Sequence, residues 1–326
     1  MAISLLVILL TIYLLTLIKA DNEVNKLVFK NDGTFKIIHV SDIHYEIPYN
    51  SCEDIYPSQL PCSSKNSTAF LEWLIETEQP DLVVHTGDII DWATYTAKEG
   101  MTEFYNVSYN MGVQWAASLG NHDDDSITML NRSAVLEFIT TLPGTLTEMG
   151  PVKSSYGNFI LEIFASVDDV SPAFRTYHFD SNDHDSSISE AQVSWYIENA
   201  ANFAETSPAP ALAFYHIPLT EYATATAEGI EYVGGYNEAI CYQSVNSGLF
   251  DEFKNYDVIA GFCGHDHTND FCVPYQGINL CYEGSAGFQA YGTQGYARRT
   301  RVTELRNFGK EVVSWKRLDT SIGDGA

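Results

Sequence analysis

The stretch FKIIHVSDIH, residues 35–44, joins a short apolar run to polar residues that can bind a metal ion. Residues 35–40 form a short, largely apolar run, which is the pattern of a strand buried on both faces. Asp42 and His44 follow that run directly. In open α/β sheets, ligand sites collect beyond the carboxyl ends of the strands. This stretch therefore predicts a buried strand with a polar site at its exit.

The same arrangement returns four more times along the chain. Each further segment ends an apolar run and carries a carboxylate, an amide or an imidazole. The four segments are Gly87-Asp88, Gly120-Asn121-His122-Asp123, Tyr215-His216 and Gly264-His265-Asp266-His267. Taken alone, a Gly-Asp pair is usually a turn, and a single strand-end histidine is usually a hydrogen-bonded core residue. All five segments together predict one site assembled from distant parts of the chain.

The residue types in these segments suit a pair of metal ions. Hard divalent cations take carboxylate and amide oxygens, while Zn, Mn and Fe also accept imidazole. The oxygen donors are Asp42, Asp88 and Asn121, and the nitrogen donors are His44, His216, His265 and His267. Two ions about 3.5–4 Å apart can clamp both oxygens of an in-line displacement and lower the pKa of bound water. The chemistry indicated is hydrolysis of a phosphoester.

Between the five segments, helical and strand-like patterns alternate. We expect helices at 67–78, 97–109, 131–140, 189–203 and 245–253, with Asn131 as the cap of the third. We expect strands at 35–40, 82–85, 112–117, 159–164, 176–179, 211–215, 258–263, 278–282, 301–305 and 312–318. Five of the seven arginines follow residue 297 and are predicted to form the charged face of the late strands.

In order and content, the five segments resemble the signature blocks of the calcineurin-like metallophosphoesterases. The resemblance extends over about residues 34–315. It is strongest to the purple-acid-phosphatase-like branch, which includes plant "probable inactive" members and fungal secreted-type phosphatases. It implies an α/β fold, a four-layer αββα sandwich of two mixed sheets flanked by helices. A single domain over residues 21–326 would form it, with late strands at 277–319 completing a sheet.

The resemblance also implies a role for each site residue. Asp42, His44, Asp88 and His267 would bind the first metal ion, with Asp88 bridging to the second. Asn121, His216 and His265 would complete the second site. The two ions would be Fe, Zn or Mn, and a hydroxide that bridges them would attack phosphorus. His122 would contact the phosphoryl group or protonate the leaving oxygen, and Asp123 would orient the His122 imidazole.

One position departs from the purple acid phosphatases. Three residues after the bridging aspartate they carry a metal-binding tyrosine, whereas this chain has Asp91. The protein should therefore not be purple, although its ligand positions are otherwise filled. We predict an active phosphomonoesterase that acts on a small phosphoester or a phosphoprotein. The alternatives are a phosphodiesterase of the acid-sphingomyelinase-like type and a catalytically silent, secreted metal-binding protein.

Charge and the N-terminal sequence limit the partners and the compartment. The formal net charge of −26 argues against nucleic acid as a partner, because phosphate contacts need Lys and Arg. Residues 3–18 are apolar and precede Lys19-Ala20, which predicts a signal peptide at 1–20 and no membrane contact after cleavage. An uncleaved anchor is the alternative. The predicted location is the secretory pathway or the exterior, and no oligomeric state is indicated.

Glycosylation motifs and cysteines agree with export. Sequons begin at Asn66, Asn106 and Asn131. An even number of cysteines, six, suits an oxidising compartment. We predict two local disulfides, Cys52–Cys62 and Cys272–Cys281. Cys241 and Cys263 could form a third, although Cys263 lies in an apolar strand and could instead be a buried thiol.

Overall fold

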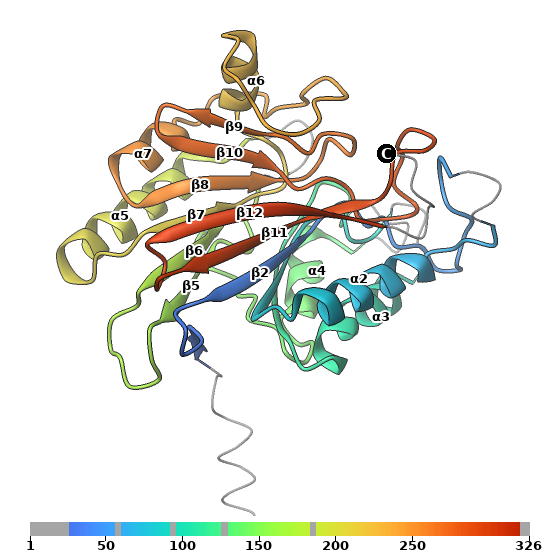
Figure 1. Ribbon diagram of the computed structural model, residues 1–326, viewed down its shortest axis with the longest axis horizontal. Helices are drawn as coiled ribbons and strands as arrows, with labels where there is room; N and C mark the ends of the chain where they lie inside the picture. Colours follow the sequence, from blue (N-terminus) through green and yellow to red (C-terminus); the bar gives the residue numbers. More distant parts are fainter. Residues whose placement is uncertain (1–25, 56–59, 92–95, 125–129, 183–186, 320–326) are drawn as a thin grey trace, which may run out of the picture.

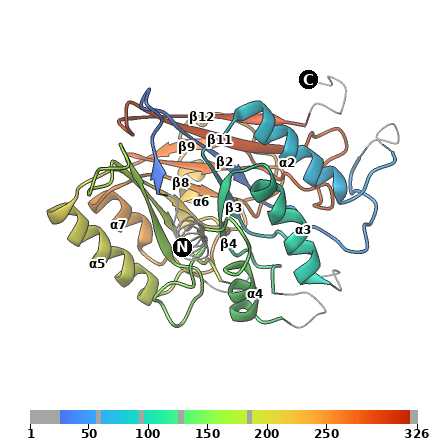
Figure 2. The same ribbon diagram turned by 90° about the horizontal axis from the view of Figure 1, so that it is seen from below.

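The computed structural model describes residues 26–55, 60–91, 96–124, 130–182 and 187–319. Two mixed sheets lie face to face, and helices cover the outer face of each (Figures 1 and 2). The predicted αββα sandwich is therefore confirmed. The predicted signal peptide at 1–20 lies outside the described residues. Across the described ranges, none of the helices combines the length and apolar character needed to cross a bilayer.

The smaller sheet carries the strand predicted at residues 35–40. Its order is β12-β11-β2-β3-β4. Strands β2, β3 and β4 are parallel, and β11 is antiparallel to both of its neighbours, β2 and β12. The strands are β2 (Phe35–Val40), β3 (Leu82–Thr86), β4 (Gln114–Ser118), β11 (Arg299–Arg306) and β12 (Glu311–Leu318). The helices α2 (Lys65–Glu78), α3 (Ala97–Asn110) and α4 (Arg132–Ile139) lie on its outer side (Figure 2).

The larger sheet has seven strands in the order β1-β5-β6-β7-β8-β10-β9. The strands are β1 (Leu27–Val28), β5 (Phe159–Phe164), β6 (Phe174–His178), β7 (Ala211–Phe214), β8 (Val258–Cys263), β9 (Cys272–Tyr275) and β10 (Ile278–Tyr282). Its central strands β6, β7, β8 and β10 are parallel neighbours. The helices on this side are α5 (Glu190–Thr206), α6 (Thr220–Ala227) and α7 (Leu249–Asn255).

Side chains alternate between the two faces of each strand, so both faces of each sheet can be apolar. Three apolar layers therefore lie between the two sheets and the two layers of helices. In β2, Phe35 and Ile37 face the other sheet, while Ile38 and Val40 face helices α2 to α4. A strand that is apolar on both faces therefore has a buried surface to fill on each side. His85 is fully buried among Phe104, Tyr105 and Trp115.

Local signals explain where several elements begin. Asn131 is the N-cap of α4, and its side-chain oxygen accepts the Ala134 N–H at 2.9 Å. The helix predicted from residue 245 starts only at Leu249, because Gly248 takes a left-handed φ of 77° and cannot belong to the helix. The sequence prediction missed α6, whose alternating Thr and Ala residues give a weak helical periodicity.

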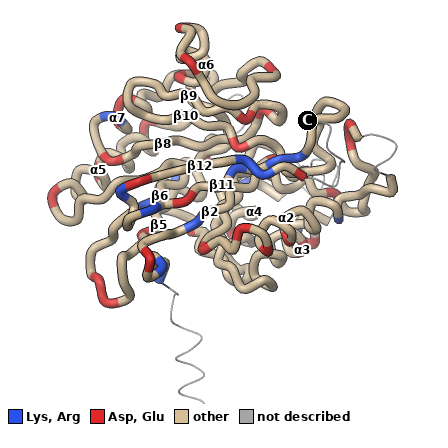
Figure 3. The backbone as a smooth tube through the Cα atoms, viewed as in Figure 1, with Lys and Arg blue, Asp and Glu red and all other residues tan. Residues whose placement is uncertain are grey.

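The two predicted local disulfides are present, Cys52–Cys62 and Cys272–Cys281. The third is not: Cys241 is exposed, and Cys263 is a buried free thiol. The late basic residues lie along β11 and β12 (Figure 3). Arg299 and Lys316 both pair with buried Asp270, at 2.6 and 2.8 Å. These cations neutralise a buried acid at the sheet, as expected of structural charges.

Candidate metal centre

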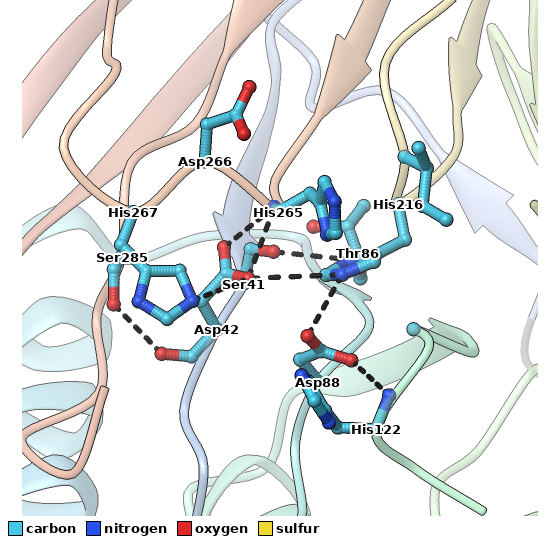
Figure 4. A network of polar contacts seen from close by, with 12 residues as sticks. Ser41, Asp42, Thr86, Asp88, His122, His216, His265, Asp266, His267 and Ser285 are labelled. Carbon is cyan, nitrogen blue, oxygen red and sulfur yellow. Dashed lines mark hydrogen bonds and ion pairs between the residues drawn. The ribbon is translucent and has the colours of Figure 1, made fainter. Parts of the chain in front are cut away.

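The five segments meet at one end of the sandwich. Asp42 and His44 follow β2, Asp88 follows β3, and Asn121 follows β4. From the other sheet, His216 follows β7, and His265 and His267 follow β8. Parallel strands of both sheets thus deliver their carboxyl ends to one place, and Figure 4 shows Asp42, Asp88, His216, His265 and His267 of this set gathered there.

The side chains form two adjacent groups of ligand type. Asp42, His44 and His267 make one group, and Asp88, His216 and His265 make the other; the ligand atoms within each group lie within 4.8 Å of one another. Asp88 lies between the groups, because its Oδ2 is 3.0 Å from His216 Nε2 and 3.7 Å from His44 Nε2. That position fits the bridging role that the resemblance implied for Asp88. Asn121 is also buried at this edge.

The outer nitrogens of two histidines determine which atom faces inward. His216 Nδ1 lies 2.8 Å from the Thr86 carbonyl, and His267 Nδ1 lies 3.1 Å from the Tyr291 carbonyl. A carbonyl only accepts, so each Nδ1–H donates, and Nε2 is the nitrogen that each ring turns to the centre. This is the tautomer that a metal-ligating imidazole needs. The donor set therefore fits divalent cations at this place.

Burial and proximity shift the ionisation of the centre strongly. Burial raises the pKa of Asp42 to about 7, against the opposing effect of His216. Burial also acts to raise the pKa of Asp88, but His216 and His44 hold it well below its usual range. For His216, burial acts to lower the pKa, yet Asp88 and Asp42 raise it to about 9. A cation would replace the protons that these buried groups otherwise share.

The backbone at the centre is held in an unusual conformation. Asp42, His44, Asp88 and His265 have left-handed φ values of 54°, 48°, 51° and 75°. Such values are uncommon for residues with a Cβ and collect at functional sites. A methyl group at Gly120 would overlap the Asp88 carboxylate, so this position of the Gly-Asn-His-Asp segment accepts only glycine. The glycine lets two strand-end loops touch.

Asp123 links the loops that carry the candidate ligands. Its Oδ2 accepts the N–H of Gly120 at 2.7 Å and of Asp88 at 3.0 Å. Its Oδ1 accepts the N–H of Ile89 at 2.8 Å and of Ile90 at 3.2 Å. The carboxylate thus joins the loop after β3 to the loop after β4. That Asp123 also orients the His122 imidazole stays a prediction.

Two further residues, Asp91 and Arg132, hold parts of the centre in position. Asp91 Oδ2 lies 3.2 Å from His44 Nδ1, so the residue found in place of a tyrosine holds a candidate ligand. The sequence feature that could have indicated this role is the position of Asp91, three residues after Asp88. Arg132 donates to the carbonyls of Gly120 and Leu119 and pairs with buried Asp180, which fixes the loop after β4. Nothing local to Arg132 indicated that role.

Comparison with known proteins assigns the family. The model of the calcineurin-like phosphoesterase family matches residues 35–269, a range that spans all five segments. The chain belongs to that family. Calcineurin-like phosphoesterases use a dimetal centre, in agreement with the two ligand groups described above.

Relatives and solved structures agree with this assignment. The chain is 33% identical to probable inactive purple acid phosphatase 14 of Arabidopsis thaliana over 90% of its own length and 83% of the relative's. It is 30% identical to phosphatase DCR2 of Saccharomyces cerevisiae, covering 92% of this chain but 56% of that protein. A dimetal phosphatase from Danio rerio has a similar structure, with a TM-score of 0.58, 13% identity, and coverage of 86% and 98%. The solved structure supports the fold, and membership of the phosphoesterase family supports a hydrolase.

Proposed function

We propose that this protein is a secreted, dinuclear metal-dependent phosphomonoesterase. The observation that carries the proposal is the pair of buried ligand groups with Asp88 between them. Asp42, His44, Asp88 and His267 would hold one ion, and Asn121, His216 and His265 would complete the other. Two divalent ions bound there would supply Lewis-acid stabilisation of a phosphoryl group and a water of lowered pKa.

The remaining residues of the centre orient the substrate and move the proton. His122 lies beside His44 with 5.4 Å between ring centroids, and its backbone N–H donates to Asp88 Oδ1 at 2.8 Å. We assign it to protonating the leaving oxygen, a task to which histidine is suited near neutral pH. Asp123 positions the loops that carry His122 and Asp88. Two disulfides support an oxidising compartment, as a secreted enzyme would have.

The first experiment is hydrolysis of p-nitrophenyl phosphate and its bis-ester by the metal-loaded protein, beside Asp88→Asn. We expect turnover of the monoester that disappears in the variant. Turnover mainly of the bis-ester would instead identify a phosphodiesterase. Bound metal without turnover of either ester would identify a silent metal-binding protein, in keeping with the "probable inactive" names of the plant relatives.

A further inference from the structure

One wall of the proposed site is a row of rings that ends at the surface. His122 neighbours His44, His44 neighbours His267, and His267 stacks on Tyr291, with centroids 5.4, 5.0 and 3.8 Å apart. The Tyr291 ring lies at 24° to the His267 ring, and the residue is 49% exposed. One face of this tyrosine therefore covers a candidate metal ligand, while the rest remains open to solvent at the edge of the centre.

Contacts on both sides hold this tyrosine in place. Its hydroxyl donates to Glu238 Oε2 at 2.9 Å, and Glu238 in turn accepts the N–H of Thr268, next to His267. On the other side, the neighbouring Gly292 donates its N–H to Asp54 Oδ2 at 2.8 Å. The segment between β10 and β11 is thus attached both to the 229–247 loop and to the Cys52–Cys62 loop. A ring fixed in this way loses little conformational entropy when a second ring packs on it.

The charge around Tyr291 limits what can pack there. Residues 286–297 contain no charged side chain, and residues 229–247 contain only the acids Glu231 and Glu238. The tyrosine hydroxyl is already committed to a carboxylate. The nearest cation is the Arg298 guanidinium, which lies against Gly292, but it is buried and donates to the carbonyls of Glu53 and Phe288. The two segments themselves leave an aromatic surface beside acids.

We propose that Tyr291 determines specificity by stacking on the leaving group, so that the preferred substrate is an aryl phosphate monoester with an uncharged or cationic leaving group. This inference rests on the proposed phosphomonoesterase activity. A phosphoryl group held near His267 has its substituent within reach of the Tyr291 ring. Aromatic pairs stabilise a complex beyond the effect of buried area alone, whereas a saturated ring of the same size gains only the area.

The test compares phenyl phosphate with cyclohexyl phosphate in four proteins: wild type, Tyr291→Ala, Tyr291→Phe and Tyr109→Ala. Tyr109 is the matched control, since it is 50% exposed and lies near the end of α3 that leads into the start of β4, opposite the centre. We expect Tyr291→Ala to lower the phenyl-to-cyclohexyl ratio of kcat/KM by about threefold to tenfold. Tyr291→Phe keeps the ring and should keep the ratio, as should Tyr109→Ala.

Metal content and the affinities for phenylphosphonate and cyclohexylphosphonate, measured by calorimetry on the metal-loaded proteins, complete the test. A selective loss of phenylphosphonate affinity in Tyr291→Ala supports the inference without requiring turnover. Two results in Tyr291→Ala would overturn the inference: an unchanged phenyl-to-cyclohexyl ratio of kcat/KM, or equal losses of affinity for the two phosphonates accompanied by loss of metal. Tyr291 would then be a positioning residue for His267. A wild type that binds phenylphosphonate selectively but hydrolyses neither ester would overturn the proposed function alone. A phosphotyrosine peptide in place of phenyl phosphate distinguishes a protein substrate from a small aryl ester.

Discussion

The Nε2 atoms of His44 and His267 lie 3.2 Å apart at the centre of the site. Each ring faces an acceptor on its outer side, Asp91 for His44 and the Tyr291 carbonyl for His267. Burial and the neighbouring His44 lower the pKa of His267, so its imidazole stays neutral. Burial acts to lower the pKa of His44, but Asp91, Asp88 and Asp42 raise it, so the Nε2–H of a protonated His44 faces the lone pair of His267 Nε2. A cation bound between the two rings would take the place of that proton.

Metal ions should therefore stabilise the fold. At a free concentration 100 times the Kd, one bound ion adds about 2.7 kcal/mol to the free energy of unfolding. Urea unfolding of the chelated protein with and without added Zn²⁺ or Mn²⁺ measures this. His216→Ala removes a ligand from one group and should lose most of the added stability. Superimposable unfolding curves with and without metal would contradict the assignment of the centre.

Replacing Asp91 should weaken metal binding without unfolding the protein. Asp91→Asn keeps the size of the side chain but removes the carboxylate that holds His44 Nδ1. Loss of such an outer partner costs about 10–100-fold in metal affinity. Competition with a fluorescent chelator gives the affinity, with Asp251→Asn as a control at a side chain that is 71% exposed. Equal affinities in the two variants would show that Asp91 does not position His44.

Substitutions at the neighbours His122 and Asp123 should affect different properties: activity at His122 and folding stability at Asp123. His122→Ala should lower kcat by about 10²–10⁴-fold, as loss of a general acid does, with little change in unfolding. Asp123→Ala leaves four buried backbone donors without their acceptor and should cost about 2–4 kcal/mol of folding free energy. Paired kinetic and urea measurements decide this. Wild-type stability in Asp123→Ala would refute its role as the link between loops.

Buried His85 should make stability fall as the pH is lowered. Burial lowers the pKa of His85 to about 3, below its usual value of 6.5. Between these two values the unfolded chain binds a proton at His85 and the folded chain does not. The stability that depends on neutral His85 is complete above pH 6.5 and is lost as pH falls towards 3. Between pH 6.5 and 4.5 the loss is about 2–3 kcal/mol.

His85→Leu tests this in metal-free protein, because leucine is apolar and does not titrate. Urea unfolding at pH 6.5 and 4.5 should show a smaller difference for the variant than for wild type, by about 2 kcal/mol. The comparison cancels the other titrating groups, which are the same in both proteins. If the unfolding free energy depends on pH identically in the variant and in wild type, His85 is not the source of the loss of stability at low pH.

The sequence by itself indicated most of the strands and the residue types that gather at the site. Residues 35–40 and 258–263 were predicted with the bounds that the structure gives, because an apolar run between polar residues is a local signal. Asn131 indicated a helix start for the same reason, since a cap acts within one turn. The five polar segments were recognisable because each lies directly at the end of its own strand.

Only the tertiary structure decided how those segments work together. That His216 and Asp88 lie 3.0 Å apart depends on two different sheets meeting face to face, which no local pattern encodes. Asp123 was assigned to its neighbour His122, yet its partners include backbone groups 33 to 35 residues away. Tyr291 reaches His267 only because the segment between β10 and β11 is attached on both sides. Apolar periodicity and caps act over a few residues, whereas these contacts arise from the packing of the two sheets.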